Sequence, residues 1–572
     1  MKIDGEAAAG LATEPDYQAL RFPYRRSADQ DAAAAVLHPV VVVGAGPVGL
    51  SLAIDLAQRG VPLVVLDNDD RLSAGSRAIC FAQRTLEIFD RLGCGERMVG
   101  KGVSWDVGRV FSGSDELYSF QLLPGTGFER PAFINLQQYF VEGYLAERAA
   151  ELPPIDLRWK HAVTKVEPGP EGVELTVETP DGPYRLRAEH LVACDGSRSP
   201  VRAAMGLESH GRVFEDRFLI ADVTMDAAFA ARFPAERWFW FDPPFHPGQS
   251  VLLHRQPDGI WRIDFQLGRD ADPEFERQPE NIAPRVRALL AASGLAGAGF
   301  ELVWASVYTF ACTRMASFRH GRVLFAGDAA HRVSPFGARG ANSGIQDADN
   351  LGWKLAAVLA GLADESLLDS YAREREAAAD ENLLNSTRST DFISPKSEIS
   401  RVFRDAVLGL ARQHGFARTL VNSGRLSLPT TLHESPLNTA DTEAFAGRML
   451  PGAPAVDAPL RRADGSPSWL LRELGGKGFV LLAWGLPAEA LAELVAAVAD
   501  LADFAPLHAV ALGPGGELAD ADGLAQQRYD LQAGTLYLLR PDRHVCARWR
   551  TPTVARLRAA LQRALQLPTS PT

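Results

Sequence analysis

Apolar residues near the start of the chain have the pattern of a strand, a helix and a second strand. Residues 40–43 are four valines followed by a glycine, which is typical of a buried parallel strand. From Pro47 to Arg59 the apolar side chains recur at helical spacing, and Gly60 then ends the pattern. Residues 61–66 are a second apolar run. We therefore expect one βαβ unit in this part of the chain.

Strand periodicity appears twice more in the first half of the chain. Residues 173–177 alternate between apolar and polar, and after an Asp-Gly turn residues 184–188 return as the second strand of a hairpin. From about residue 208 the sequence has the texture of a β-sheet. Residues 261–267 alternate Trp, Ile, Phe and Leu with Arg, Asp and Gln. This alternation predicts a sheet with one buried apolar face and one polar face.

The second half of the chain begins with a predicted strand at residues 321–326 that ends in Gly-Asp. Helical spacing follows at residues 342–360 and continues to about residue 425. Prolines between residues 428 and 452 predict a linker. After it, apolar runs at 479–483, 507–512 and 536–539 flank a helical pattern at 487–499. We expect a separate small α/β domain from about residue 450.

Composition narrows the class of protein. The 572 residues predict three to four domains at roughly 150 residues each. With 46% hydrophobic and 23% charged residues the chain is not mostly disordered, and its net charge of −12 argues against nucleic acid as a partner. No apolar stretch is long enough to span a membrane, and the polar first 35 residues do not resemble a secretion signal. We expect a cytoplasmic protein.

The cysteines are too scattered for a disulfide framework or a zinc site, because no two of them form a CxxC pair. We therefore expect no metal. The five positions are Cys80, Cys94, Cys194, Cys312 and Cys546.

The sharpest local motif is GAGPVG, which follows the first predicted strand and opens the helix at Pro47. Gly44 makes the tight turn, Gly46 lets a pyrophosphate approach the backbone, and Gly49 lets helix and strand pack closely. The helix N-terminus offers N–H groups to the phosphates. Asp67 ends the second strand, where a carboxylate accepts a hydrogen bond from a ribose hydroxyl. The motif fits NAD and FAD equally.

Three further motifs favour FAD. CDGSRSPVR at 194–202 and GDAAH at 327–331 each follow a predicted strand, and an Asp there can accept a hydrogen bond from a ribose or ribityl hydroxyl. PFGARGAN at 335–342 supplies glycines that let the backbone approach a flat ring. The helix beginning near Asn342 would aim its first N–H groups at the N1/C2=O edge of a flavin.

These motifs, in this order and spacing over residues 38 to 380, resemble the class A flavoprotein monooxygenases of the aromatic hydroxylase type. The whole chain is similar to their phenol hydroxylase and 3-(3-hydroxyphenyl)propionate hydroxylase branch. The resemblance implies an α/β fold: a Rossmann-like FAD-binding domain, an inserted antiparallel β-sheet substrate domain and a C-terminal thioredoxin-like domain without redox cysteines. The expected parts are an N-terminal arm (1–37), the FAD domain (38–207 and 321–430), the substrate domain (208–320) and the thioredoxin-like domain (450–572).

The resemblance also carries cofactor contacts onto this sequence. It assigns the ADP half of FAD to Gly44, Gly46, Pro47, Gly49 and Asp67, where Asp67 replaces the more usual Glu. Two side chains near the cofactor would be Arg77 and Gln138, and Asp195 belongs to the segment linked with FAD and NAD(P)H. Contacts to the ribityl chain and the isoalloxazine ring would come from Gly327, Asp328, Pro335, Gly337, Gly340, Ala341 and Asn342. His331 suits a structural hydrogen bond beside the cofactor better than the role of a base.

The chemistry implied is hydroxylation of a phenolic substrate. NADH or NADPH would reduce FAD, O2 would form a flavin C4a-hydroperoxide, and an ionised phenol would take up the distal oxygen. The protein's part is to exclude water and to position the ring. Candidate catalytic residues in the substrate domain are Asp222, His210 and Arg217, with His254 and Tyr308 as further polar groups. Asp222 follows the apolar residues 218–221, so it would end a strand that faces the pocket.

Two other functions stay open from sequence alone. One is a different flavin-dependent oxygenase on the same scaffold, an epoxidase or a halogenase. Residues 238–243 only superficially resemble the halogenase WxWxIP segment. The other is a non-catalytic binding protein of this fold, which would not need to keep the GD and GxxGxN features. The expected partners are a small aromatic substrate and a second copy in a homodimer; the choice of aromatic and of NADH or NADPH is open.

Overall fold

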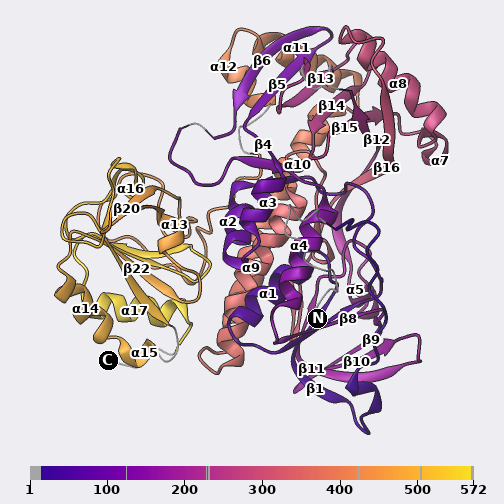
Figure 1. Ribbon diagram of the computed structural model, residues 1–572. Coiled ribbons are helices and arrows are strands. Elements are labelled where there is room, and N and C mark those ends of the chain that lie inside the picture. Colours follow the sequence, from indigo (N-terminus) through magenta and orange to yellow (C-terminus); the bar gives the residue numbers. More distant parts are fainter. Residues whose placement is uncertain are drawn as a thin grey trace, which may run out of the picture.

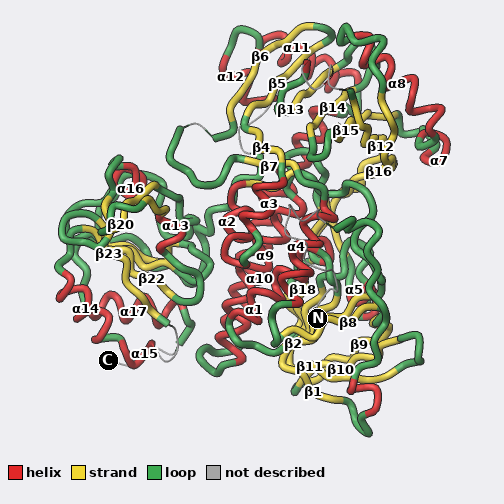
Figure 2. Tube along the Cα trace, viewed as in Figure 1, coloured by secondary structure: helices red, strands yellow, loops and turns green. Residues whose placement is uncertain are grey.

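The computed structural model describes residues 15–123, 125–226, 229, 232–421, 426–502 and 506–567. Figure 1 shows a central body of helices and strands, a β-sheet at one end of it and a smaller C-terminal unit at its side. Figure 2 shows that helices cluster in the middle of the molecule, while each of the three parts contains strands. Among the described residues, none of the helices combines the length and the apolar character needed to cross a bilayer.

The predicted βαβ unit is confirmed. It consists of β1 (Val36–Val43), α1 (Pro47–Gln58) and β2 (Leu63–Asp67), with β1 and β2 parallel. The second strand starts later than expected, because the Val61 N–H donates to the Leu56 carbonyl at 3.1 Å and closes the end of the helix. The sheet runs in the order β17-β18-β11-β1-β2-β8 and includes β8 (Ile155–Trp159), β11 (Tyr184–Ala193), β17 (Arg319–His320) and β18 (Val323–Phe325).

The predicted hairpin is also confirmed, as β10 (Gly172–Glu178) and β11. With β9 (Ala162–Gly169) it extends the same sheet. Short strands β3 (Cys80–Ala82), β4 (Val103–Trp105) and β7 (Phe133–Asn135) form a separate small sheet. Around these strands lie α2 (Gln83–Leu92), α3 (Gly95–Lys101), α4 (Gln138–Ala150) and α5 (Pro200–Ala204).

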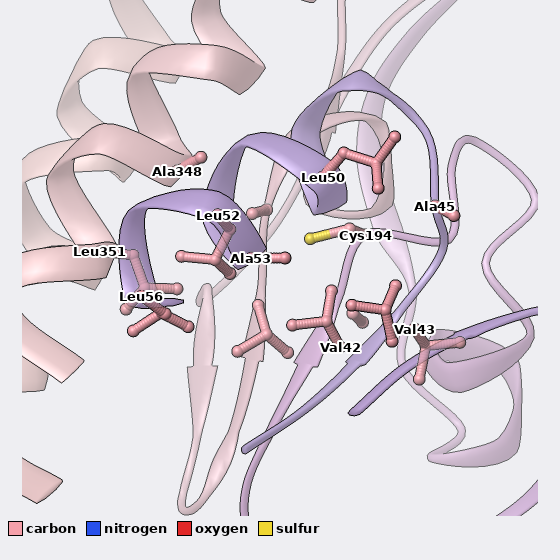
Figure 3. Packing of buried hydrophobic residues seen from close by; sticks show 14 of the residues in the cluster. Val42, Val43, Ala45, Leu50, Leu52, Ala53, Leu56, Cys194, Ala348 and Leu351 are labelled. Atoms are coloured by element: carbon pink, nitrogen blue, oxygen red, sulfur yellow. The ribbon is translucent and has the colours of Figure 1, made fainter. Parts of the chain in front are cut away.

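Helix α1 is the centre of the first core. Its apolar side chains, Leu52 and Leu56 among them, are fully buried between the valines of β1 and helix α9 (Gly340–Leu359). Figure 3 shows Leu351 of α9 beside Leu56 at one end of α1, and Val42 of β1 below the helix. The core therefore fixes α1 and α9 against each other, and both helices begin at glycine-rich motifs.

The second sheet has the order β19-β16-β12-β15-β14-β13-β5-β6. Its strands pair antiparallel except β13 with β5. Its first two strands in the chain, at residues 107–121, come from within the predicted FAD domain. The members are β5 (Val107–Ser112), β6 (Asp115–Gln121), β12 (Ser209–Met225), β13 (Arg237–Phe241), β14 (Ser250–Arg255), β15 (Ile260–Leu267), β16 (Phe300–Met315) and β19 (His331–Arg332).

One expectation about this sheet was incomplete. Trp261, Ile263 and Phe265 face an apolar core that α8 (Pro279–Ala292) covers, with α7 (Pro273–Glu276) before it. The alternate residues Arg262 and Asp264 are also buried. The polar face is thus covered by the rest of the protein and does not face solvent. Its buried polar side chains are therefore candidates for a functional site.

Helices and a proline-bearing connection lead to the C-terminal unit. The helices are α10 (Leu367–Ile393), α11 (Glu398–Ala411) and α12 (Gly415–Val421), as the helical pattern predicts. The unit has a sheet of order β21-β20-β24-β23-β22-β25-β26. Its strands are β20 (Pro459–Arg462), β21 (Pro467–Trp469), β22 (Phe479–Trp484), β23 (Leu507–Leu512), β24 (Leu518–Ala519), β25 (Leu536–Leu539) and β26 (Val545–Trp549). Its helices are α13 (Leu470–Glu473), α14 (Ala488–Ala496), α15 (Ala499–Ala502), α16 (Leu524–Tyr529) and α17 (Val554–Ala564).

A buried charge network joins this unit to the central helices. Arg540 is fully buried and donates to Glu374 of α10 at 2.6 Å and to Asp542 at 3.0 Å. Lys354 of α9 donates to the same Glu374 carboxylate at 2.7 Å. Burial lowers the pKa of Lys354 to about 8. Burial opposes ionisation of Glu374, but Arg540 and Lys354 outweigh it and hold the pKa of Glu374 below its ordinary value of 4.5.

Replacing Arg540 with Met is therefore expected to destabilise the protein by about 3–5 kcal/mol, because two buried carboxylates lose their partner. Urea unfolding followed by circular dichroism measures this loss. As the matched control, Arg558→Met removes the exposed ion pair with Asp500 and should leave the midpoint almost unchanged. An equal, small shift in both variants would contradict the role given to the network.

The pKa of Glu374 is lowered on folding. The contribution of its ionised carboxylate to the free energy of unfolding is therefore present above pH 4.5 and is lost as the pH falls below that value.

Candidate functional site

The glycine fingerprint has the close contacts that a dinucleotide loop needs. Gly44 has φ of +105°, and a Cβ atom there would lie 2.4 Å from the Cys194 carbonyl oxygen. A Cβ on Gly49 would lie 1.9 Å from the Gly44 oxygen, so strand and helix can approach only because both residues are glycine. Gly46 differs, because a Cβ there meets no described atom within 4 Å. Space is therefore left above Gly46, at the start of α1, where a phosphate would approach.

Asp67 stands at the end of β2 and holds the glycine loop. Its carboxylate accepts from the Ala45 N–H at 2.6 Å and from the Asp69 N–H at 2.8 Å. Burial raises the pKa of Asp67, and these two N–H groups partly offset that rise. The carboxylate lies beside the glycine loop, which is the position expected of a side chain that binds a ribose hydroxyl. The contact to ribose itself stays a prediction.

Gln138 and Arg77 belong to one cluster. The Gln138 side chain accepts from the Ala78 N–H at 3.0 Å and donates to the Ser73 hydroxyl at 3.0 Å and to Glu142 at 2.7 Å. It thereby fixes the loop at residues 73–78, which contains Arg77. The carbonyls of Ser76 and Arg77 accept from Arg262 of the second sheet, at 3.1 and 2.8 Å. This loop therefore lies between the fingerprint domain and the buried polar face.

Asp195 and Asp328 are the two strand-end carboxylates that were predicted from sequence. One Asp195 oxygen accepts from the Val201 N–H at 3.0 Å, while the other has no hydrogen-bond partner among the described residues. The Asp328 side chain is exposed, yet enough protein surrounds it to raise the pKa of its carboxyl, against the opposing effects of His331 and Arg332. Burial likewise raises the pKa of Asp195. Both aspartates thus offer acceptor oxygens to a hydroxyl-bearing ligand.

The Gly-Asp loop is fixed from behind by Asp347 of α9. This fully buried carboxylate accepts from the Gly327 N–H at 2.9 Å, from His331 Nε2 at 2.6 Å and from Arg375 of α10 at 2.7 Å. Burial opposes its ionisation, but His331 and Arg375 together lower the pKa of Asp347. His331 is buried and stacks on Phe318, so its hydrogen bond is structural, as predicted.

The N-terminus of α9 presents backbone N–H groups and few free side-chain atoms. Asn342 Oδ1 accepts from the Ala82 N–H at 2.8 Å, and its Nδ2 donates to the carbonyls of Cys80 and Ala338. The side chain of Asn342 is therefore committed to holding β3 and the preceding turn. The N–H groups of Gly340, Ala341 and Asn342 lie in the first turn, where a helix has no carbonyl of its own to accept from them.

The turn before α9 has the backbone freedom that its sequence predicts. The Ala338 N–H donates to the Pro335 carbonyl at 3.0 Å, and Gly337 has φ of +99°. Ala338 also has positive φ, at 54°. The turn delivers the chain to Gly340, where the helix begins.

Asp222 lies on the buried polar face of the second sheet. Its side chain accepts from Gln256 Nε2 at 3.1 Å, and the strand register places it opposite Arg262. Burial raises the pKa of Asp222 to about 6, although Arg262 opposes that rise. A carboxylate with this pKa is ionised near neutral pH and can still accept a proton.

The other two catalytic candidates do not join Asp222. His210 is exposed near the start of β12. Arg217 lies five positions before Asp222 in the same strand, and this odd spacing points the two side chains to opposite faces. Arg217 donates to the Ala271 carbonyl beside α7.

Sequence reasoning missed most of the groups that surround Asp222. Arg262 and Asp264 belong to the alternating pattern of residues 261–267, from which we predicted a polar face but no role in the site. No such pattern marks Arg237, and Gln256 follows the end of β14. The residues are Arg237, Gln256, Arg262 and Asp264, together with His254, which the sequence analysis named without a role.

Comparison with known proteins places the chain among FAD enzymes. The family model described as "FAD binding domain" matches residues 38–386. A 3-(3-hydroxy-phenyl)propionate/3-hydroxycinnamic acid hydroxylase of Mycolicibacterium smegmatis is 30% identical over 78% of this chain and 76% of its own. A 6-methylpretetramide 4-monooxygenase of Streptomyces rimosus is 32% identical over 92% of this chain and 94% of its own.

Solved structures share the fold. The flavin-dependent monooxygenase PieE, in complex with FAD and substrate, has a TM-score of 0.80 at 23% identity and covers 94% of this chain and 100% of its own. Aklavinone-11 hydroxylase, with FAD and aklavinone, has a TM-score of 0.73 at 24% identity and covers 92% and 99%.

The open space above Gly46 gives a direct test of the cofactor site. Gly46 has φ of −76°, so Gly46→Ala should fold normally, while its methyl group occupies the approach of the pyrophosphate. We expect FAD affinity to fall by about 100-fold, or roughly 2.7 kcal/mol, in a fluorescence titration, with an unchanged melting temperature. The control, Gly100→Ala in α3, is equally uncrowded and should bind FAD normally. Normal FAD binding by the Gly46 variant would show that the loop does not hold the cofactor.

The residues present fit FAD: an open glycine cradle that Asp67 holds, an unpartnered Asp195 oxygen, and an accessible Asp328 on a loop that Asp347 fixes. The family model covers more than half of the chain, and relatives of 30% identity or more match most of its length. The chain belongs to the class A FAD-dependent aromatic hydroxylases.

Proposed function

We propose that this protein hydroxylates a phenolic aromatic compound at the expense of NAD(P)H and O2. The named activities of its relatives support the proposal, since they include a 3-(3-hydroxy-phenyl)propionate/3-hydroxycinnamic acid hydroxylase and a 6-methylpretetramide 4-monooxygenase. The observation that carries it is Asp222, a buried carboxylate with a pKa of about 6 on a sheet face that contacts the loop of Ser76 and Arg77. A buried carboxylate whose pKa lies close to neutral supports the role of a general base toward a phenol.

FAD, when bound, supplies the electron transfer and O2 chemistry that no amino-acid side chain provides. The chain's own residues have three tasks. The loop of Gly44 to Gly49 and the carboxylates of Asp67, Asp195 and Asp328 bind the cofactor. The N–H groups at the start of α9 stabilise negative charge at the ring edge nearest to them.

The third task is proton transfer at Asp222 Oδ. Ionised Asp222 would take the phenol proton and raise the electron density of the aromatic ring, which favours attack on an electrophilic oxygen. Gln256 donates to this carboxylate and orients it, while Arg262 keeps part of its charge in balance. Burial of the polar face would exclude water from the bound aromatic ring, which favours the oxygen-transfer chemistry that FAD would supply there.

A second candidate substrate class has its own support. Relatives of 32% identity act on 6-methylpretetramide and anhydrotetracycline, which are fused polycyclic phenols. A fused aromatic substrate would use the same Asp222 chemistry. The two classes differ in size, so a substrate panel separates them.

The proposal extends to the domains and the assembly. Residues 208–320 would be the substrate domain. The support is that strands β12 to β16 of the second sheet lie in the chain between β11 and β18, which are strands of the first sheet. The C-terminal unit would be thioredoxin-like, which the strand order β23-β22-β25-β26 with α14 after β22 and α17 after β26 supports. Its one described cysteine, Cys546, is buried, so a redox role is not part of the proposal. We also propose that the protein forms a homodimer and acts in the cytoplasm.

The FAD-loaded protein should oxidise NADH or NADPH slowly alone and much faster with its phenol, with O2 uptake and a catechol-type product in mass spectrometry. The panel would contain 3-(3-hydroxyphenyl)propionate, hydroxybenzoates, resorcinols, alkylphenols and fused polycyclic phenols. Fast NAD(P)H oxidation without product from any phenol would sink the hydroxylase proposal and favour another oxygenation. A protein that cannot be loaded with FAD would also contradict the family assignment.

Asp222→Asn keeps the shape of the side chain and removes its basicity. We expect turnover with a phenol to fall by about 10²- to 10⁴-fold. In the wild type the rate should rise with pH through about 6, as Asp222 loses its proton, and this limb should vanish in the variant. Asp270→Asn, at an exposed carboxylate, is the matched control. A variant that keeps the wild-type pH profile would assign the base elsewhere.

A further inference from the structure

Helix α11 has two apolar faces, and this chain covers only one of them. The covered face contains Val407, Leu408 and Ala411, which are all buried. Leu408 and Ala411 pack in an apolar cluster with Phe218 of β12 and Phe336 of the turn before α9. Figure 1 shows α11 and α12 at the end of the molecule that carries the second sheet. The inner face of α11 is therefore accounted for by the fold.

The other apolar face of α11 is exposed. Phe403 is 58% exposed and Ile399 is 83% exposed. At 3.6 residues per turn the members of this face project within about 100° of one another, so they form one stripe along the helix. Helix α12 follows directly and adds Phe416 and Leu420, which are also exposed and lie one helical turn apart. The stripe on α11 consists of Ile399, Val402, Phe403, Ala406 and Leu410.

The size of the exposed apolar surface indicates a partner. Phe403 at 58% and Phe416 at 63% exposure together leave about 200–300 Å² in solvent, since one such side chain has about 150–250 Å². The exposed aliphatic side chains of both helices add to this area. Monomeric soluble proteins rarely expose contiguous apolar patches larger than a few hundred Å². We therefore looked for the surface that the stripe fits.

One flank of the stripe carries charges of alternating sign. The charged residues there project within about 60° of one another. A helix that lies on a lipid surface has a polar face rich in Lys and Arg, whereas this flank has as many acids as bases. The alternation favours a protein partner with the same pattern. In chain order the flank consists of Glu398, Arg401, Asp405 and Arg412, all of them exposed.

An antiparallel second copy of α11 matches this flank with itself. About a two-fold axis, a residue that lies a number of positions before the axis meets the residue that lies as many positions after it. Glu398 and Arg412 have their midpoint at residue 405, and Arg401 and Asp405 have theirs at residue 403. An axis near residue 404 thus brings each acid close to a base of the other copy.

The same axis also matches the apolar stripe. Val402 and Ala406 have their midpoint at residue 404, and the midpoint of Ile399 and Leu410 lies between residues 404 and 405. A large side chain therefore meets a smaller one near the axis, and two aliphatic side chains meet farther from it. One register satisfies the charged and the apolar pairs together, which an arbitrary exposed helix would not do.

We propose that the stripe on α11, with Phe416 and Leu420 of α12, is the surface at which two copies of this chain associate about a two-fold axis near residue 404. The apolar side chains form the core of the interface and the charged flank forms its rim, as is usual in interfaces of about 800 Å² per partner. Association also holds α11 against the sheet that carries Asp222. This inference rests on the proposed homodimer and names its contact surface.

Sedimentation equilibrium of the FAD-loaded protein tests the apolar core of this interface. The wild type should have the mass of two chains at micromolar concentration. Phe403→Gln should raise the dissociation constant of the dimer at least about 30-fold, because each dimer loses two buried aromatic side chains. The matched control is Phe275→Gln in α7, since Phe275 is 59% exposed and lies outside the stripe. The control should dimerise as the wild type does.

A charge exchange tests the antiparallel register. Glu398→Arg should raise the dissociation constant about tenfold, because like charges then face each other at both ends of the interface. Adding Arg412→Glu to the same chain should restore most of the affinity, since both pairs are then re-formed with reversed sign. Arg412 also pairs with Asp115 of its own chain, but both side chains are exposed and this pair contributes little. The rescue depends on partner geometry and not on folding.

A wild type that is monomeric up to high micromolar concentration would overturn the proposal. A monomer that sediments with phosphatidylcholine and phosphatidylglycerol vesicles would instead assign the stripe to a membrane surface. A dimer that Phe403→Gln leaves intact would place the interface elsewhere, and a double charge variant as weak as Glu398→Arg would overturn the register. Mass is measured without turnover, so failure here differs from failure of the hydroxylase function, which would appear as absence of hydroxylated product.

Discussion

The buried carboxylate of Asp347 is the interaction on which the rest of the site depends. It joins three elements to α9: the Gly-Asp loop through Gly327, the following strand through His331, and helix α10 through Arg375. Because Asp347 belongs to α9, the loop that carries Asp328 is fixed relative to the start of that helix. A charge with no exposed surface remains ionised there only because each of its donors is in place.

A second consequence of the fold is the sheet with two buried faces. One face packs apolar side chains such as Trp261 and Ile263 against α8, and the other places Asp222, Arg237 and Arg262 under the central body. Burying a polar face costs free energy unless its groups find partners. Most of them do, and among the described residues the exceptions on this face include Arg237 Nε and Nη1, His254 Nε2 and Gln256 Oε1.

The C-terminal unit contributes to the same geometry from the opposite side. Arg540 contacts Glu374 of α10, and Lys354 of α9 contacts the same carboxylate. The apolar cluster continues this contact, since Trp353 packs with Phe479 of β22. Helix α9 is therefore held by this unit at Trp353 and Lys354, and Asp347 holds it nearer its start. The charged contacts reach α10 at the adjacent residues Glu374 and Arg375.

The local parts of this architecture could be predicted from sequence, and the convergent parts could not. Strand β1, helix α1 and the glycine turn follow from local pattern, because valine runs, helical spacing and small residues act over a few positions. Asp347 was not singled out, since nothing local distinguishes one aspartate in a helix from another. Arg217 was chosen beside Asp222 without regard to strand alternation, which points the two side chains in opposite directions. Arg262 was predicted only as part of a polar face and Arg237 was not singled out, because the sequence does not reveal what covers a sheet.

The most direct test of the central claim is a crystal structure of the FAD-loaded protein. The account predicts the isoalloxazine ring between the first N–H groups of α9 and the buried face that carries Asp222, with the pyrophosphate over Gly46. A ring bound away from that face, or a pyrophosphate that does not contact the loop of Gly44 to Gly49, would contradict it.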